Sequence, residues 1–362
     1  MKKKSLWAII ALAGLTISSC TNDEVIPNTS ADNAIEFGTY LGRDAQTRGT
    51  TLTTSNLTNF GVFAYYTGNA DYETAPFTPN FMYDQLVQKS LGETEWNYAP
   101  EKYWPNNSGD KVSFFAYAPH QDHVAMATSP GQADDPKINF SVDETTNKQI
   151  DLLWAKQVDK TKQAVNEKVK FTFQHALSRI AFSVESIINK VNGDETNTPD
   201  DDANGTYYVD NATTVKVKQV RLLGEFANTG TLNLNDGTWV PASQTETAYV
   251  LNSENFNPIR DAVENSKKQL NREDSYLMIL PQTTTCKIEV TYDVITTDGA
   301  LSGGNSTITN VITSEAFDFN FGQGNAYNFC LHLGMTSVKF DAEVKNWNNI
   351  DDIAVNVPLN KN

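Results

Sequence analysis

The sequence predicts an all-β protein with little helix, folded as two tandem β-sandwich domains. The 362 residues are rich in Thr, Asn, Val, Tyr and Phe, which favour strands and polar turns. Short segments that alternate between apolar and polar residues follow one another, with Gly, Asn and Asp between them. No long amphipathic helical pattern interrupts this series. The length is sufficient for two domains of ordinary size.

The first twenty residues have the layout of an export signal. Lys2, Lys3 and Lys4 precede an apolar run from Leu6 to Ile17, and Ser18-Ser19-Cys20 follows. The run is too short for a permanent membrane span, and small residues before a Cys resemble a bacterial lipobox. We expect 1–19 to be a lipoprotein signal peptide and the Cys20 thiol to carry a lipid that tethers the chain to the outer membrane. An ordinary signal peptide that happens to contain a Cys is the alternative.

The residues between this signal and the first domain form a tether and one strand. Residues 21–33 are polar and predict a flexible connection. Ala34–Leu41 alternates, with Ile35, Phe37 and Leu41 on one face, and predicts a strand. We assign residues 20–48 to this lipidated segment, and 49–165 to the N-terminal domain.

Within the N-terminal domain, two nearly continuous apolar segments predict strands that are buried on both faces. These are Asn59–Tyr66 and Lys111–Ala118, and a shorter run follows at Asp151–Ala155. From Val158 to Lys170 the chain turns polar and Lys-rich, and we place the domain boundary there.

The C-terminal domain is expected over residues 166–350. Lys170–Glu185 predicts one long strand, with a change of parity near Ser178-Arg179 that indicates a bulge. His175 lies on its apolar face, which favours a hydrogen-bonded core histidine. Asn257–Gln269 is the one predicted helix. Further strands are expected at Thr214–Leu223, Tyr276–Leu280, Cys286–Ile295, Ile308–Thr313, Ala326–Leu333 and Val338–Val344.

Two cysteines remain after Cys20. Cys286 shares the parity of the apolar residues of its strand, whereas Cys330 has the opposite parity in its own strand. Opposite faces favour two separate thiols over a disulfide, although an oxidising compartment would permit pairing.

The last twelve residues, 351–362, predict a half-buried strand. Ile353, Val355, Val357 and Leu359 share one parity. Pro358 lacks an N–H group, so this strand belongs at a sheet edge or close to its own end. The tail could therefore pair with another chain or pack on its own domain.

The charge and the motifs exclude several functions. The chain carries 28 Lys and Arg against 44 Asp and Glu, a net charge of −16, which argues against nucleic acid as a partner. It contains no His-Glu-x-x-His, Gly-x-Ser-x-Gly or Cys-x-x-Cys motif, so we expect neither an enzyme nor a cofactor.

One acidic loop has part of a calcium-site pattern. Asp200, Asp202 and Asn204 occupy positions 1, 3 and 5 of that pattern, and Gly205 occupies position 6. Position 12 is Asn211 instead of the Glu that calcium loops use, so we favour a disordered acidic loop and expect no metal.

Several ordered segments resemble the fimbrillin (Mfa-like) family of type V pilins from Bacteroidales. They are Tyr103-Trp104-Pro105, Val112–Pro119, Phe171–Phe182, Leu280-Pro281-Gln282, and Gly324–Phe329 with Val344 and Trp347. The resemblance implies two transthyretin-like sandwiches and a fimbrial structural subunit that mediates cell adhesion. It also implies assembly by strand exchange with other pilin subunits, after a trypsin-like, Arg-specific protease removes an N-terminal strand.

The residues are compatible with that assembly. Arg43 and Arg48 are the only basic residues between Ser5 and Gln88, and Arg48-Gly49 lies in a small polar stretch suited to proteolysis. Cleavage there would remove the lipid and the first strand, and expose a groove that another subunit's alternating tail could fill. Because donor and acceptor lie at opposite ends of the chain, growth would be head-to-tail. A tail able to donate favours a shaft subunit over a tip subunit.

The alternative is a stand-alone surface lipoprotein that binds glycans. Its stacking platform would be the densest aromatic cluster, Trp96, Tyr98, Tyr103 and Trp104.

Overall fold

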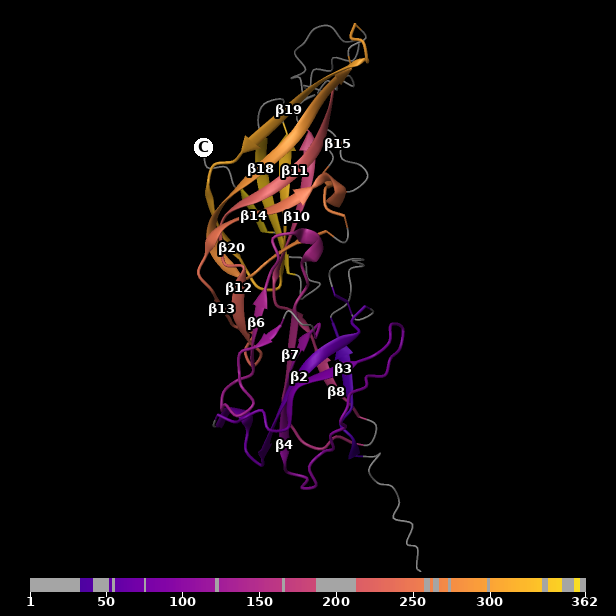
Figure 1. Ribbon diagram of the computed structural model, residues 1–362, viewed down its shortest axis with the longest axis vertical. Helices are drawn as coiled ribbons and strands as arrows, with labels where there is room; N and C mark the ends of the chain where they lie inside the picture. Colours follow the sequence, from indigo (N-terminus) through magenta and orange to yellow (C-terminus); the bar gives the residue numbers. More distant parts are fainter. Residues whose placement is uncertain are drawn as a thin grey trace, which may run out of the picture.

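The computed structural model describes residues 33–41, 52–53, 56–74, 76–120, 124–164, 167–186, 213–256, 261–262, 267–272, 275–297, 300–333, 338–346 and 355–358. Strands dominate these residues, and the only helical elements in the described part are short 3-10 turns. The prediction of an all-β fold is confirmed. In the described part of the chain, no helix is long and apolar enough to cross a membrane. Two lobes lie one above the other along the long axis (Figure 1).

The N-terminal lobe is built on an antiparallel five-stranded sheet, which faces a two-stranded parallel sheet. The larger sheet has the order β3-β2-β4-β7-β9, and the smaller one pairs β1 with β8. Their bounds are β1 (Phe37–Tyr40), β2 (Asn59–Gly68), β3 (Met82–Gln88), β4 (Lys111–Ala118), β7 (Leu153–Lys160), β8 (Val169–Thr172) and β9 (Gln174–His175).

The central strands β2 and β4 are buried on both faces, as their apolar sequences predict. Phe60 and Phe114 point into a core closed by β1 and β8, whereas Phe63 and Phe115 point into a second core that continues into the other lobe. All four side chains are fully buried.

The C-terminal lobe consists of two packed sheets, as expected for a β-sandwich. One sheet has the order β16-β10-β21-β22-β23, with β17 also paired to β10; the other has the order β14-β11-β18-β19, with β15 on β11 and β20 on β18. The bounds are β10 (Ser178–Ser186), β16 (Lys268–Gln269), β17 (Leu277–Ile279), β21 (Asn325–Leu333), β22 (Val338–Asn346) and β23 (Val355–Pro358) for the first sheet, and β11 (Thr213–Phe226), β14 (Thr245–Asn252), β15 (Asp261–Ala262), β18 (Gln282–Thr297), β19 (Asn305–Thr313) and β20 (Phe317–Phe321) for the second.

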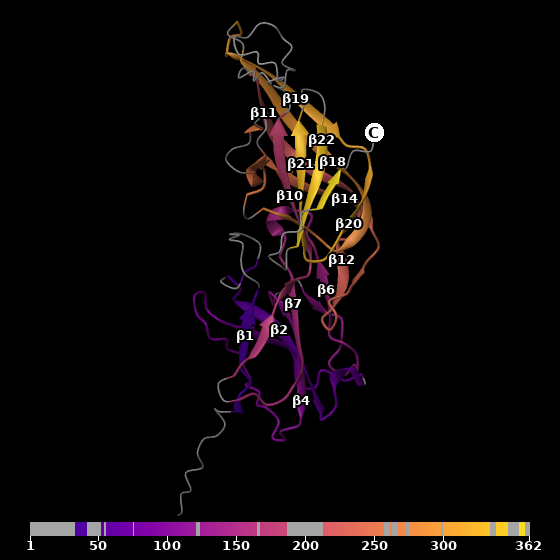
Figure 2. The same ribbon diagram turned by 180° about the vertical axis from the view of Figure 1, so that it is seen from behind.

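A further sheet joins the two lobes. Its order is β13-β12-β6-β5, so two strands from each half of the chain join in one hydrogen-bonded unit (Figures 1 and 2). The bounds are β5 (Ala125–Met126), β6 (Lys137–Ser141), β12 (Thr229–Asn233) and β13 (Trp239–Pro241). Because β6 pairs with β12 over five residues, the junction is a continuous piece of sheet and not a simple linker.

Two expectations about the elements were wrong. The segment Lys170–Glu185 is three strands, because β8 pairs with β1, β9 pairs with β7, and only β10 enters the C-terminal sheet. Residues 169–175 thus pair with N-terminal strands, and we propose that the domain boundary lies near Leu177 instead of residue 165. The predicted helix Asn257–Gln269 contains β15 and β16, because pairing with β11 and β10 overrides local helix propensity.

Candidate functional site

The N-terminal strand lies in a groove of the N-terminal lobe. Ile35, Phe37 and Leu41 are 1%, 1% and 5% exposed, so the three residues predicted to share a face all enter the core. Phe37 is at the centre of this contact. Its ring lies 5.4–6.0 Å, centroid to centroid, from four aromatic rings, those of Tyr98, Phe171, Phe114 and Phe60.

This segment is hydrogen-bonded to β8 along one edge and makes a single bridge on the other side. On one side, the N–H groups of Val169 and Phe173 donate to the carbonyls of Glu36 and Tyr40, each at 2.8 Å. On the other, Ile35 N–H donates to the Lys102 carbonyl at 2.8 Å. The ladder with β8 is therefore the main backbone contact, and a single bridge before β1 adds to it. Removal of the segment would leave the edge of β8 unpaired.

The aromatic cluster forms one wall of the groove. Tyr98 donates a hydrogen bond to the Ile35 carbonyl at 2.8 Å, and desolvation by burial raises the pKa of its phenol to about 12. Trp104 is 4% exposed, and Trp96 packs edge-on against Phe60 at 4.8 Å. Tyr103, at 42%, is the only exposed residue of the four. The cluster expected to stack on glycans is therefore largely occupied in holding the strand.

The chain beyond the predicted cleavage site is also anchored. Leu52 N–H donates to Oδ2 of Asp151 at 2.8 Å, and His175 Nδ1 lies 3.0 Å from the same oxygen. Asp151 is fully buried and His175 is 6% exposed. His175 is thus a hydrogen-bonded core histidine, as its position on an apolar strand face predicts.

Several predicted site residues lie outside the described part of the chain. They are the lipidation residue Cys20, the cleavage residues Arg48 and Gly49, the loop residues Asp200, Asp202 and Asn204, and the tail residues Ile353 and Leu359. The two remaining cysteines, Cys286 and Cys330, are described; both are buried, and neither is in a disulfide.

The C-terminal tail is a strand at the edge of its own sheet. In β23, Val355 stands opposite Val344 and Val357 stands opposite Ala342, in an antiparallel pair with β22. β23 is the last strand in the order of this sheet, so it has one strand neighbour in the described structure. Pro358 is its final residue, which is where a residue without an N–H group is tolerated.

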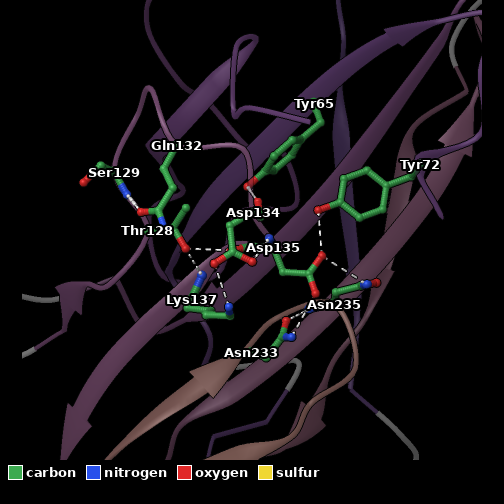
Figure 3. A network of polar contacts seen from close by, with 10 residues as sticks. All are labelled: Tyr65, Tyr72, Thr128, Ser129, Gln132, Asp134, Asp135, Lys137, Asn233 and Asn235. Atoms are coloured by element: carbon green, nitrogen blue, oxygen red, sulfur yellow. Dashed lines mark hydrogen bonds and ion pairs between the residues drawn. The ribbon is translucent and has the colours of Figure 1, made fainter. Parts of the chain in front are cut away.

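A partly buried polar network connects the two lobes at their junction (Figure 3). Oδ1 of Asp135 accepts a hydrogen bond from Tyr72 at 3.0 Å, and Oδ2 accepts one from Asn233 at 2.9 Å. Asn235 donates to Oδ1 at 3.3 Å. Sequence reasoning missed this network, because its residues come from separate segments that carry no recognisable motif.

A comparison of the chain with known protein families agrees with this architecture. The sequence model of the family described as fimbrillin-like matches residues 47–347. The chain belongs to the fimbrillin-like family. The resemblance inferred from its motifs is therefore confirmed. The matched region begins one residue before Arg48 and ends before β23.

Several bacterial surface proteins are similar over most of the chain. The fimbrium subunit Fim1C of Phocaeicola vulgatus is 27% identical, and the match covers 99% of this chain and 100% of that protein. The crystal structure of a fimbrial protein from Bacteroides vulgatus has a TM-score of 0.66 at 20% identity, covering 87% of this chain and 99% of the other. A candidate cell adhesion protein from Bacteroides uniformis has a TM-score of 0.50 at 16% identity, with coverages of 88% and 99%.

Proposed function

We propose that this fimbrillin-like chain is a fimbrial shaft subunit assembled by strand exchange. An Arg-specific, trypsin-like protease cleaves after Arg48, β1 leaves its groove, and the tail of another subunit takes its place. The observation that carries the proposal is how β1 is held in its groove. The strand is hydrogen-bonded to β8, Ile35 just before it bonds to Lys102, and the segment buries the side chains of Ile35, Phe37 and Leu41. Arg43 and Arg48 both lie in the sequence between this strand and the body of the N-terminal lobe.

The energetics favour replacement of the lost strand. Each of the three side chains of β1 contributes roughly 1.5–3 kcal/mol through burial, so an empty groove is unfavourable. The tail carries four apolar residues of one parity, Ile353, Val355, Val357 and Leu359. In its own sheet β23 has one strand neighbour among the described residues, and in the groove β8 would likewise give the transferred tail one strand neighbour. Transfer of the tail would thus keep a backbone partner and gain apolar burial in the groove.

The location of the subunit follows from the same scheme. Lipid on Cys20 holds the exported precursor at the outer membrane. Cleavage after Arg48 separates the body from residues 20–48 and from the lipid. Since each subunit would accept at one end and donate at the other, the product is a head-to-tail polymer.

Processing is tested by comparing Arg48→Ala with the matched control Arg43→Ala in cells that assemble the fimbrium. Sheared surface material is separated without boiling, and its subunit is subjected to N-terminal sequencing. We expect wild type and Arg43→Ala to begin at Gly49 and to form a ladder of polymers. Arg48→Ala should remain as an uncut monomer. Polymers built from chains that begin at Cys20 would refute the proposal.

A further inference from the structure

Three potential metal ligands gather on one face of the C-terminal lobe. They are Glu185 near the end of β10 and Cys330 and His332 on β21. The two strands are parallel neighbours, with Ser183 opposite Cys330 and Glu185 opposite His332. Alternation along each strand places these side chains opposite Phe182, Val184, Phe329 and Leu331, which fill the sandwich core. The cluster therefore occupies the face of the sheet that looks away from that core.

The geometry brings three different donor atoms together. The Glu185 carboxylate oxygen, the Cys330 sulfur and a ring nitrogen of His332 all lie within 4.8 Å of one another. His332 Nδ1 is 3.4 Å from Oε2 of Glu185. Cys330 is fully buried, whereas the side chains of Glu185 and His332 are 15% and 25% exposed. The sulfur is thus sheltered, and the two other donors remain accessible to a dissolved ion.

We propose that Glu185, Cys330 and His332 bind one zinc ion. A thiolate, an imidazole and a carboxylate are the ligands that zinc takes, whereas calcium and magnesium require oxygen donors. In a tetrahedral zinc site, neighbouring donor atoms are roughly 3.3–3.7 Å apart, given the usual zinc–ligand distances. Small torsional changes of Glu185 and His332 would bring the three donors to that separation. Water would supply the fourth ligand.

Zinc at this position would link β10 to β21 near their carboxyl ends. On binding, the Cys330 thiol loses its proton to solvent, and the sulfur bonds to the metal as thiolate. Because the three ligands come together only in the folded chain, zinc would stabilise the fold by mass action. The proposal concerns a site distinct from the β1 groove, so its failure would leave the fimbrial proposal unaffected.

The site is tested on the purified full-length chain after chelator treatment and removal of the chelator. Zinc chloride is titrated by calorimetry, and the protein is also titrated with cobalt(II), whose absorption reports a thiolate ligand. We expect one zinc per chain and a rise in Tm on the order of 5 °C at a hundredfold excess over Kd. The cobalt complex should show a sulfur-to-metal charge-transfer band.

Single substitutions show which of the two buried thiols, Cys330 or Cys286, binds the metal. Cys330→Ser should abolish the charge-transfer band and the stoichiometric zinc binding. His332→Ala and Glu185→Gln should each weaken binding by about tenfold or more, because each removes one ligand. Cys286→Ser is the matched control, since Cys286 lies in the sandwich core with Ile288 and Val290, and it should bind zinc as wild type does. Absence of zinc binding to wild type, or equal binding by Cys330→Ser, would overturn the proposal. A site that binds copper but not zinc would also overturn the proposal. If Cys330→Ser does not fold, the band should persist in Cys286→Ser and Cys20→Ser, and loss of the band in either of them would overturn the proposal.

Discussion

The backbone N–H of Leu52 donates a hydrogen bond to the buried carboxylate of Asp151, with 2.8 Å between Leu52 N and Asp151 Oδ2. Leu52 follows the predicted cleavage bond Arg48–Gly49 closely in the sequence. Asp151 leads into β7, in the middle of the N-terminal lobe. The contact thus holds the start of the processed chain to the body of the lobe, on the side of the cut that would remain.

Replacing Asp151 by Ala should destabilise the protein strongly. The substitution leaves Leu52 N–H and His175 without their buried acceptor, and each buried polar group left unsatisfied costs about 1–3 kcal/mol. Asp151→Asn keeps an acceptor and should cost less. Urea denaturation gives the free energy of unfolding. Asp71→Ala is the control, because it removes an exposed ion pair with Lys111 that solvent screens. Equal losses in the two Ala variants would show that the buried pair has no special role.

Replacing Phe37 by Ala should destabilise only the unprocessed chain. Its ring fills the aromatic core, and removal of a buried Phe side chain costs about 3–5 kcal/mol. Tyr40, which is 49% exposed on the same strand, provides the control variant Tyr40→Ala. Chemical denaturation is measured before and after treatment with an Arg-specific protease. A deficit of the same size in the processed, assembled protein would mean that β1 does not leave.

Local alternation was sufficient to predict some elements but not their partners. The spacing of Ile35, Phe37 and Leu41 predicted which face of this segment is buried, because one face of a strand must enter a core. The same reasoning treated Lys170–Glu185 as one strand. The parity change near Ser178 in fact marks the point where the chain passes from N-terminal strands to β10. Choice of partner depends on tertiary packing that no single segment encodes.

The groove wall and the junction lay beyond sequence reasoning for the same reason. The alternative glycan-binding hypothesis requires Tyr98 and Trp104 to be exposed, and the sequence does not reveal what covers a side chain. In the structure they contact Asn33 and Ile35, more than sixty positions earlier in the chain. The sheet that combines β6 with β12 similarly joins segments about ninety residues apart.

High pH should weaken the binding of the N-terminal strand in its groove, because the Tyr98 phenol loses its proton. Desolvation by burial raises the pKa of this phenol from 10.0 to about 12 in the folded chain. The folded state therefore keeps its proton when the unfolded state has lost it. The stabilising contribution is complete below about pH 10, and it is lost as the pH rises from about 10 to 12.

The matched variant for this effect is Tyr98→Phe. At neutral pH it should lose about 1 kcal/mol, because the hydrogen bond to the Ile35 carbonyl is absent. Between pH 9 and 11 its stability should fall less steeply than that of wild type, as followed by urea denaturation at each pH. Parallel pH profiles of the two proteins would contradict the assignment.

The junction network should contribute to stability through Asp135. Asp135→Ala removes the acceptor for Tyr72, Asn233 and Asn235, and hydrogen bonds to a charged group contribute about 1.5–3 kcal/mol each. Asp134→Ala is the control, because the Asp134 carboxylate pairs with Lys137 in a partly exposed position worth about 0–1 kcal/mol. Thermal unfolding by calorimetry checks both variants. A single transition that broadens or splits only in Asp135→Ala would show that the network couples the lobes. Identical transitions would refute this role.

Gly237 offers the sharpest test of the junction, because it contacts the other lobe directly. Its φ is +75°, and a Cβ built there would lie 2.1 Å from Cζ2 of Trp154 on β7. Gly92 also has a positive φ, +89°, but a Cβ there would meet nothing within 4 Å. Gly92→Ala should therefore cost about 1 kcal/mol from backbone strain alone. Gly237→Ala should cost about 2–5 kcal/mol, because overpacking against Trp154 adds to that strain. The difference in unfolding free energy between the two variants measures the interlobe contact. It should shrink in a Trp154→Leu background, where the ring is absent. If Gly237→Ala costs no more than Gly92→Ala in the wild-type background, the two lobes are not packed closely at this point.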